Sequence, residues 1–112
     1  MRPFELIQFI HTPLFDESMA AVPMTDEELR SLQNDLQANP EAGNLVRGTG
    51  GARKIRVGVE RRGKSAGARV IYYYAGRDRT IYLILAFSKK DAATLSQAGK
   101  TVIRALIQEL SS

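Results

Sequence analysis

Cysteine and tryptophan are absent from the 112-residue chain, and histidine occurs once. The absence of cysteine excludes disulfide bonds and thiolate metal sites, and it fits a reducing compartment. His11 stands near Pro13 at the end of an apolar run, where a loop residue is far more common than a catalytic base. No carboxylate pair, no Ser-His-Asp set and no cluster of metal ligands is apparent in the sequence. We therefore expect neither a metal nor a cofactor.

Long apolar runs are missing as well. With no run of about 20 apolar residues, the sequence predicts no membrane span and no membrane partner. The first residues do not read as a secretory signal, because Glu5 and Gln8 interrupt their short apolar run. A cytoplasmic location follows as the default expectation. The length suits one domain over residues 1–112, since domains cluster at about 100–150 residues.

Acidic residues are scarce in the middle of the chain. Residues 47–90 hold twelve lysines and arginines against Glu60 and Asp78, which gives a net charge of +10. Residues 1–46 carry −6 and residues 91–112 carry 0, so the overall charge of +4 hides a strong asymmetry. Like charges crowded into one segment repel one another, which favours an anionic partner. A solvated basic face without a ligand is the alternative interpretation of a charge excess alone.

Three runs rich in β-branched and aromatic residues lie within this basic segment, at residues 53–60, 68–74 and 81–87. They predict three consecutive strands, because such residues fit the pleated surface of a sheet. Breaks that contain glycine separate them, at residues 61–67 and 75–79. The first break is basic and glycine-rich, and we expect it to form a hairpin loop able to grip a phosphate backbone.

The rest of the chain predicts a strand at residues 4–10, a short helix at 14–22 and a longer helix ended by Pro40. Thr25 and Glu28 form a capping box at the start of the longer helix. A C-terminal helix follows, and helical spacing gives it an apolar stripe. That stripe consists of Val102, Ile103, Leu106, Ile107 and Leu110.

The cations of the basic strands are the best candidates for chemistry. Side chains alternate along a strand, so Lys54 and Arg56 share one face while Arg53 takes the other. Arg69 stands in an otherwise apolar strand, where it needs a partner or an aqueous cleft, because an unpaired buried charge is costly. The tyrosines at 72–74 can stack on exposed bases, although tyrosines in a central strand are usually part of the core.

These residues suit the cleavage of RNA, in which a 2′-hydroxyl attacks its own adjacent phosphate. The reaction needs a base for the hydroxyl proton, stabilisation of the pentacoordinate phosphate and a proton for the leaving 5′-oxygen. Arginines stabilise such charge through paired donors, but they do not act as bases near neutral pH. A lysine can act as a base where neighbouring cations favour its neutral form, and Lys54 between Arg53 and Arg56 is so placed.

The runs GTGGARKIRV, ARVIYYY and YLILAFSKKDAATLS, followed by an amphipathic helix, resemble the RelE/HigB-type toxins of bacterial type II toxin–antitoxin modules, in the RelE/ParE superfamily. The likeness runs from about Pro40 to the C-terminus. It implies an α+β fold, in which a small antiparallel sheet carries N-terminal helices on one side and a C-terminal helix on the other. It further implies an mRNA interferase, a ribosome-dependent and metal-independent endoribonuclease that cuts mRNA in the A site and inhibits translation. A cognate antitoxin, often a DNA-binding repressor of the helix-turn-helix type, would hold it silent.

The resemblance also implies a role for each matching position. Lys54 and Arg56 match the positions of the family's proposed base and phosphate contacts, and Arg69 matches the arginine that stabilises the transition state. Lys90 falls where the family has a proposed general acid, usually an arginine. The family's C-terminal stacking tyrosine has no counterpart, since Leu95 lies near its place. Further contacts to RNA are expected from Arg53, Arg61, Arg62, Lys64, Tyr73 and Lys89.

Two other functions are compatible with the same sequence. ParE-like toxins share the fold and inhibit DNA gyrase by binding it, but they do not need cations that converge on one phosphate. The grouping of Lys54, Arg56, Arg69 and Lys90 therefore favours RNA cleavage. The third possibility is a basic RNA-binding or ribosome-binding module without catalysis. Such a module would keep most of its RNA affinity after the loss of one cation, because each phosphate contact contributes only a share.

Overall fold

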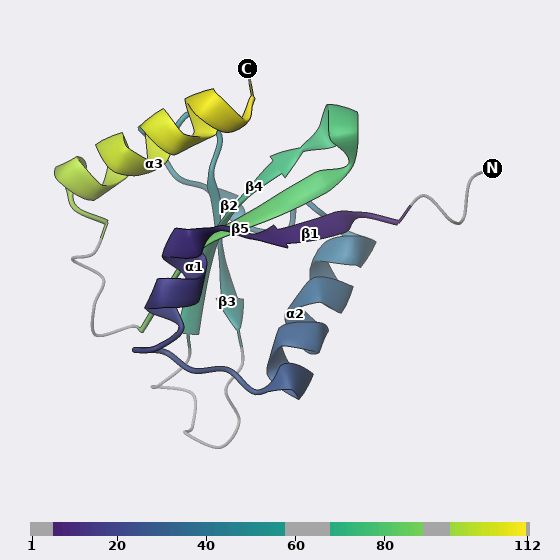
Figure 1. The fold of residues 1–112 in the computed structure, drawn as a ribbon. Helices are drawn as coiled ribbons and strands as arrows, with labels where there is room; N and C mark the ends of the chain where they lie inside the picture. The colour runs from purple at the N-terminus through teal and green to yellow at the C-terminus, as the bar shows by residue number, and fades with distance from the viewer. Residues whose placement is uncertain (1–5, 58–67, 89–94, 112) are drawn as a thin grey trace.

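A five-stranded sheet in the order β1-β5-β4-β3-β2 forms the centre of the computed structural model, which describes residues 6–57, 68–88 and 95–111. Three helices pack on this sheet (Figure 1). The strands are β1 (Gln8–His11), β2 (Asn44–Leu45), β3 (Arg53–Val57), β4 (Ala68–Ala75) and β5 (Thr80–Ser88). The helices are α1 (Pro13–Ser18), α2 (Asp26–Ala38) and α3 (Gln97–Leu110), and a 3₁₀ turn at Gly76–Asp78 joins β4 to β5.

Neighbouring strands are antiparallel except at one edge, where β1 runs parallel to β5. The expected α+β fold is confirmed, with α1 and α2 on one side of the sheet and α3 on the other (Figure 1). The three predicted basic strands are present as β3, β4 and β5, although β3 is described only as far as Val57. The parallel pairing of β1 could not be predicted, because the alternation of side chains along a strand carries no information about its direction.

Thr12 and Pro13 set the start of α1, one residue before the predicted position. The Thr12 hydroxyl accepts a hydrogen bond from the Phe15 N–H at 3.1 Å, and Pro13 occupies the first helical turn, where its missing N–H costs nothing. The same hydroxyl donates to the Leu83 carbonyl at 2.9 Å, which ties the helix start to β5. This proline ends β1 and also begins the helix that follows.

The capping box of α2 is present as predicted. The Glu28 N–H donates to the Thr25 hydroxyl at 3.0 Å, and the Thr25 N–H donates to the Glu28 carboxylate at 2.9 Å. These two bonds satisfy donors that the first turn of a helix leaves unpaired. The helix ends at Ala38, with Asn39 as its C-cap before Pro40.

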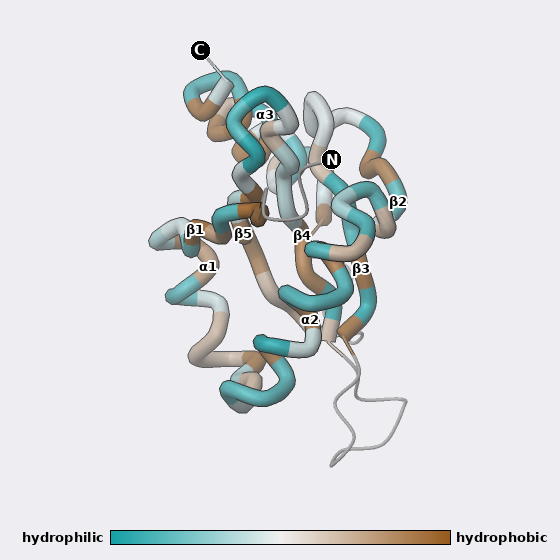
Figure 2. The backbone as a smooth tube through the Cα atoms, turned by 90° about the vertical axis from the view of Figure 1, so that its right-hand side faces the viewer, coloured by the Kyte–Doolittle hydropathy of each residue, from teal (hydrophilic) through white to brown (hydrophobic). Residues whose placement is uncertain are grey.

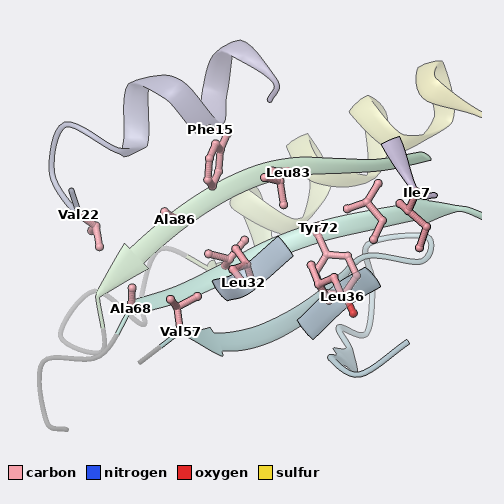
Figure 3. Close-up of a cluster of buried hydrophobic side chains, with 12 residues drawn as sticks. Ile7, Phe15, Val22, Leu32, Leu36, Val57, Ala68, Tyr72, Leu83 and Ala86 are labelled. Atoms are coloured by element: carbon pink, nitrogen blue, oxygen red, sulfur yellow. The ribbon is translucent and has the colours of Figure 1, made fainter. Parts of the chain in front are cut away.

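Two apolar clusters hold the layers together, one on each face of the sheet. Side chains of α1 and α2 pack on the first face, in a cluster that includes Phe15, Leu32, Leu36, Tyr72 and Leu83 (Figure 3). Side chains of α3 pack on the second face, in a cluster that includes Ile71, Ile84, Phe87, Ile103 and Ile107. The backbone coloured by hydropathy shows α2 as mostly hydrophilic and the inner strands as mostly hydrophobic (Figure 2). Val102, expected in the apolar stripe of α3, is instead 59% exposed, because Ile103 and Ile107 define the buried side.

A β-bulge interrupts the pairing of β4 with β5. Ile71 pairs with Leu85 and Tyr72 pairs with Leu83, so Ile84 is the extra residue. An extra residue reverses the faces of the side chains beyond it. Phe87 consequently lies on the α3 face of the sheet, directly opposite Arg69.

Candidate nucleic-acid interface

Arg56 and Arg69 lie directly opposite each other in the ladder between β3 and β4. Residues opposite each other in a ladder project from the same face of a sheet. Ile55 and Val57 pack in the cluster under α1 and α2, so the alternating Lys54 and Arg56 project from the α3 face. The predicted sharing of one face by Lys54 and Arg56 is confirmed, and the register adds Arg69 to that face.

These three cations are open to solvent or close to it. Lys54 and Arg56 are exposed, and Arg69 is half-buried. Within the described part of the chain, none of the three has a hydrogen bond or an ion pair to its side chain. The α3 helix covers the neighbouring Ile71 and Phe87 and leaves the β3 side of this face uncovered. The arrangement therefore presents three positive charges that an external anion can approach.

The side chain of Arg53 lies on the opposite face of the sheet. Its guanidinium donates to the Gly43 carbonyl at 2.7 Å and to the Glu41 carbonyl at 3.2 Å. The Glu41 carboxylate lies 3.9 Å from the same group. These contacts fix the connection between α2 and β2, and they separate Arg53 from the three cations of the α3 face.

Tyr72 fixes the same connection from β4. Its buried hydroxyl accepts a hydrogen bond from the Gly43 N–H at 2.9 Å and donates to the Pro40 carbonyl at 2.9 Å. Burial raises the pKa of Tyr72, and the hydrogen bond from Gly43 and the charge of Arg53 offset part of that rise. A Cβ on Gly43 would lie 2.8 Å from the Lys54 carbonyl oxygen, so glycine permits this close approach. Tyr72 is thus a core residue and not a stacking platform.

Tyr73 was predicted to contact RNA, and it lies on the α3 face. Its ring stacks on that of Tyr82, with 6.5 Å between the centroids, and the side chain is half-buried. Three residues of β4 separate it from Arg69. Of the other predicted contacts, Lys89 and Lys90 lie outside the described residues, as do Arg61, Arg62 and Lys64.

Sequence reasoning did not single out Lys100 and Arg104 of α3. Their aliphatic stems lie over the loop before β3, since a Cβ on Gly48 would be 3.7 Å from Lys100 Cδ and one on Gly50 would be 3.4 Å from Arg104 Cγ. Gly48 and Gly50 have positive φ, a backbone conformation that favours glycine. The available signal was the spacing of the two cations, which puts both on one side of the helix next to its apolar stripe.

The two layers of helices differ in charge. The segments of α1 and α2 contain six acidic residues against Arg30 alone. The α3 helix contains Lys100 and Arg104 against Glu109. The positive residues of β3 and β4 without a partner among the described residues project from the α3 side. The described part of the molecule is therefore acidic on one side of its sheet and basic on the other.

The sequence comparison agrees with this geometry. Residues 10–112 match the family described as the RelE toxin of the RelE / RelB toxin-antitoxin system. The chain belongs to the RelE toxin family. A solved structure of a double mutant of the Escherichia coli toxin RelE in the free state has the same fold, with a TM-score of 0.58 at 15% sequence identity. That similarity covers 87% of this chain and 98% of the E. coli chain.

Membership of the RelE toxin family identifies the protein as the toxin of a toxin–antitoxin system and implies an antitoxin as its partner. The RelE fold accounts for the layers described above, with a sheet between N-terminal helices and a C-terminal helix. Among residues 6–57, 68–88 and 95–111, no helix has the length and apolar character that crossing a membrane requires.

Proposed function

We propose that this RelE-family toxin is a ribosome-dependent, metal-independent endoribonuclease of the cytoplasm that cuts mRNA in the A site and thereby inhibits translation. The observation that carries the proposal is the pairing of Arg56 with Arg69 on one solvent-accessible face, with Lys54 two residues away. Two guanidinium groups that face one phosphate supply paired donors to its oxygens, and such preorganised donors are a large source of rate enhancement.

The reaction assigns one role to each cation. The 2′-oxygen attacks the adjacent phosphorus, its proton passes to the Lys54 amine, and the bond from phosphorus to the 5′-oxygen breaks. Arg56 and Arg69 stabilise the negative charge that accumulates on the phosphate oxygens. The leaving 5′-oxygen takes up a proton, for which Lys90 is the proposed donor. The products are a 2′,3′-cyclic phosphate and a free 5′-hydroxyl.

The α3 face suits this chemistry better than it suits inhibition of DNA gyrase. Binding to a protein target does not require two arginines directly opposite each other with no acidic partner among the described residues. Like charges in that position are unfavourable for the sheet, which favours a function that uses both of them.

The decisive experiment is primer extension on an mRNA translated in a purified system that contains no gyrase. The wild type is compared with Arg69→Ala and with Arg77→Ala, which removes an exposed arginine from the far end of the β4–β5 hairpin. We expect ribosome-dependent cuts that Arg77→Ala retains and Arg69→Ala slows on the order of 10²-fold or more. The same mRNA without ribosomes should stay intact.

Two outcomes would contradict the proposal. Translation that proceeds unimpaired, without cuts, would leave gyrase inhibition or passive RNA binding as the function. Cuts by Arg69→Ala at the wild-type rate would remove Arg69 from the reaction centre. The corresponding test in cells is expression of the chain alone, which should be toxic for the wild type and tolerated for Arg69→Ala at equal protein levels.

The antitoxin proposed for this protein covers the basic face through acidic residues of its own, or displaces α3. We further propose that it is a DNA-binding protein of the helix-turn-helix type. Charge complementarity supports the first part, because the α3 face carries three cations without an acidic partner in the described residues. Co-expression of the antitoxin should restore growth, and high salt should weaken the complex.

A further inference from the structure

Three cations outside the proposed reaction centre belong to α3 and to the loop before β3, which α3 covers. Arg47 belongs to this loop and is exposed, while Lys100 and Arg104 lie on α3 with their stems over Gly48 and Gly50. We call these three residues the α3 cation group. In the described ranges, none of the three side chains has an ion pair or a hydrogen bond.

The stems of Lys100 and Arg104 are held in place by packing, which leaves their charged ends free. Because Gly48 and Gly50 carry no side chains, the methylene groups of Lys100 and Arg104 occupy the space over this part of the loop. The Thr49 hydroxyl donates to the Val46 carbonyl at 2.7 Å and accepts from the Ala52 N–H at 3.1 Å, so the loop is braced internally. A braced loop with two fixed stems reduces the entropy that a charged group loses when it binds an anion.

The loop that carries Arg47 and lies under α3 leads directly into β3, which carries Lys54 and Arg56 of the proposed reaction centre. The glycine loop leads into Ala52, which is buried under α3, and Lys54 and Arg56 follow at two and four residues further on the same face. At about 3.3 Å per residue, Ala52 and Arg56 are separated by roughly 13 Å. A single RNA strand can therefore contact both groups within a few nucleotides.

We propose that the α3 cation group binds the phosphate backbone of the mRNA substrate at nucleotides next to the cleaved bond. This inference rests on the proposed function, which it extends from one phosphate to a path along β3. Positively charged grooves that follow the backbone of a single strand are the common solution for binding RNA without base recognition. The group holds the strand and takes no part in bond cleavage.

The Lys100→Gln/Arg104→Gln double variant tests this binding role with an RNA that cannot be cleaved. The probe is a single-stranded RNA of 12 nucleotides with 2′-O-methyl groups, which blocks attack by the 2′-oxygen, and binding is followed by fluorescence anisotropy between 50 and 300 mM salt. We expect the affinity at 150 mM salt to fall roughly tenfold and the slope of log K against log salt to decrease by about 1.4, since each phosphate contact on a single strand contributes about 0.7.

The matched control is the Arg30→Gln/Arg77→Gln double variant, which removes the same charge from α2 and from the β4–β5 turn. It should bind the probe like the wild type. Equal losses in both double variants would show that net charge alone governs binding and would overturn the proposal. Thermal unfolding of each variant verifies that the fold is retained.

Cleavage on the ribosome tests the same idea through kinetics. The Lys100→Gln/Arg104→Gln variant should need more mRNA for half-maximal cleavage while its saturated rate stays within about twofold of the wild type, because uniform binding affects KM alone. Arg69→Ala should instead lower the saturated rate. A fall in the saturated rate of the α3 double variant to the level of Arg69→Ala would overturn the assignment of a binding role.

Ribosomal RNA is the other source of phosphate, and empty ribosomes distinguish it from mRNA. If the α3 double variant loses affinity for ribosomes without mRNA and keeps its affinity for the probe, the surface contacts the ribosome and the proposal is wrong. Different results would contradict the proposed function and the proposed RNA path along β3. Wild-type cleavage by Arg69→Ala overturns the proposed function, whereas unchanged probe binding by the α3 double variant overturns the path along β3.

Discussion

Arg56 of β3 faces Arg69 of β4 directly across the ladder, and neither has an acidic partner among the described residues. Like charges opposite each other in a sheet are destabilising by about 0.2–1 kcal/mol. Phe87 lies opposite Arg69 on its other side, so neither of the two residues directly opposite Arg69 is acidic. The fold keeps a repulsive pair in the place where the proposed reaction needs two cations around one phosphate.

Arg56→Gln should consequently stabilise the protein while it weakens cleavage. We expect the free energy of unfolding at low salt to rise by about 0.2–1 kcal/mol, as measured by urea denaturation. The gain should disappear near 1 M salt, where the Debye length is about 3 Å. Arg77→Gln removes the same charge from an exposed turn and should change stability little. An Arg56→Gln protein that is less stable than the wild type at low salt would contradict this account of the pair.

Lys54→Arg distinguishes a base from a plain positive charge at this position. Arginine keeps the charge but cannot be deprotonated in proteins, so it cannot accept the 2′-hydroxyl proton. If Lys54 is the base, Lys54→Arg should lose cleavage almost as completely as Lys54→Gln, on the order of 10²–10⁴-fold. Single-turnover cleavage on stalled ribosomes measures the rate, and binding to the 2′-O-methyl probe serves as the control. Full activity in Lys54→Arg would leave Lys54 with an electrostatic role only.

The elements that sequence predicted best are those with a local signal. The capping box of Thr25 and Glu28 depends on residues three positions apart, and the strands depend on alternation within a few residues. The face shared by Lys54 and Arg56 follows from the same alternation. The position of Arg69 opposite Arg56 is different, because it depends on the register between β3 and β4. The alternation of side chains within each strand does not determine which residues of the two strands lie opposite each other.

Contacts between distant segments could not be predicted. The Tyr72 hydroxyl reaches Gly43 and Pro40, which are 29 and 32 residues away in the sequence. No glycine or proline in β5 marks the bulge at Ile84 in the sequence. This bulge nevertheless determines which face of the sheet Phe87 occupies. Lys100 and Arg104 gained a candidate role only once α3 was placed over the glycine loop.

Gly43→Ala should be markedly destabilising, and Gly76→Ala is its control. A Cβ at position 43 would lie 2.8 Å from the Lys54 carbonyl oxygen and 2.9 Å from Tyr72 Cε1, and both are held by the surrounding strands. Overpacking of this kind costs about 1–3 kcal/mol. The atoms nearest to a Cβ at position 76 would be those of the Tyr74 side chain, with Cε2 at an ordinary contact distance of 3.5 Å. Chemical denaturation of both variants should separate them, and equal stabilities would show that the 40–43 connection yields to the extra methyl group.

Tyr72→Phe removes one oxygen and leaves the buried Gly43 N–H without its acceptor. An unsatisfied buried donor costs about 1–3 kcal/mol, which we expect as the loss in the free energy of unfolding near neutral pH. The ring remains in the core with Leu36, so cavity formation contributes little. Urea denaturation at pH 7 measures the loss, and a difference below about 0.5 kcal/mol would mean that the hydroxyl contributes no net hydrogen-bond energy.

The pH dependence of this difference follows from the raised pKa of Tyr72. Burial favours the neutral phenol, so the folded state binds the proton more tightly than the unfolded state, whose tyrosine pKa is about 10. The stabilising contribution of the hydroxyl is therefore complete below pH 10 and is lost as the pH rises through the higher pKa of the folded protein. The stability of the wild type relative to Tyr72→Phe should stay constant from pH 7 to about 9.5 and shrink above pH 10. Lysine deprotonation affects both proteins alike, so it cancels in this difference, and a constant difference up to pH 11 would show that Tyr72 stays accessible to water in the folded state.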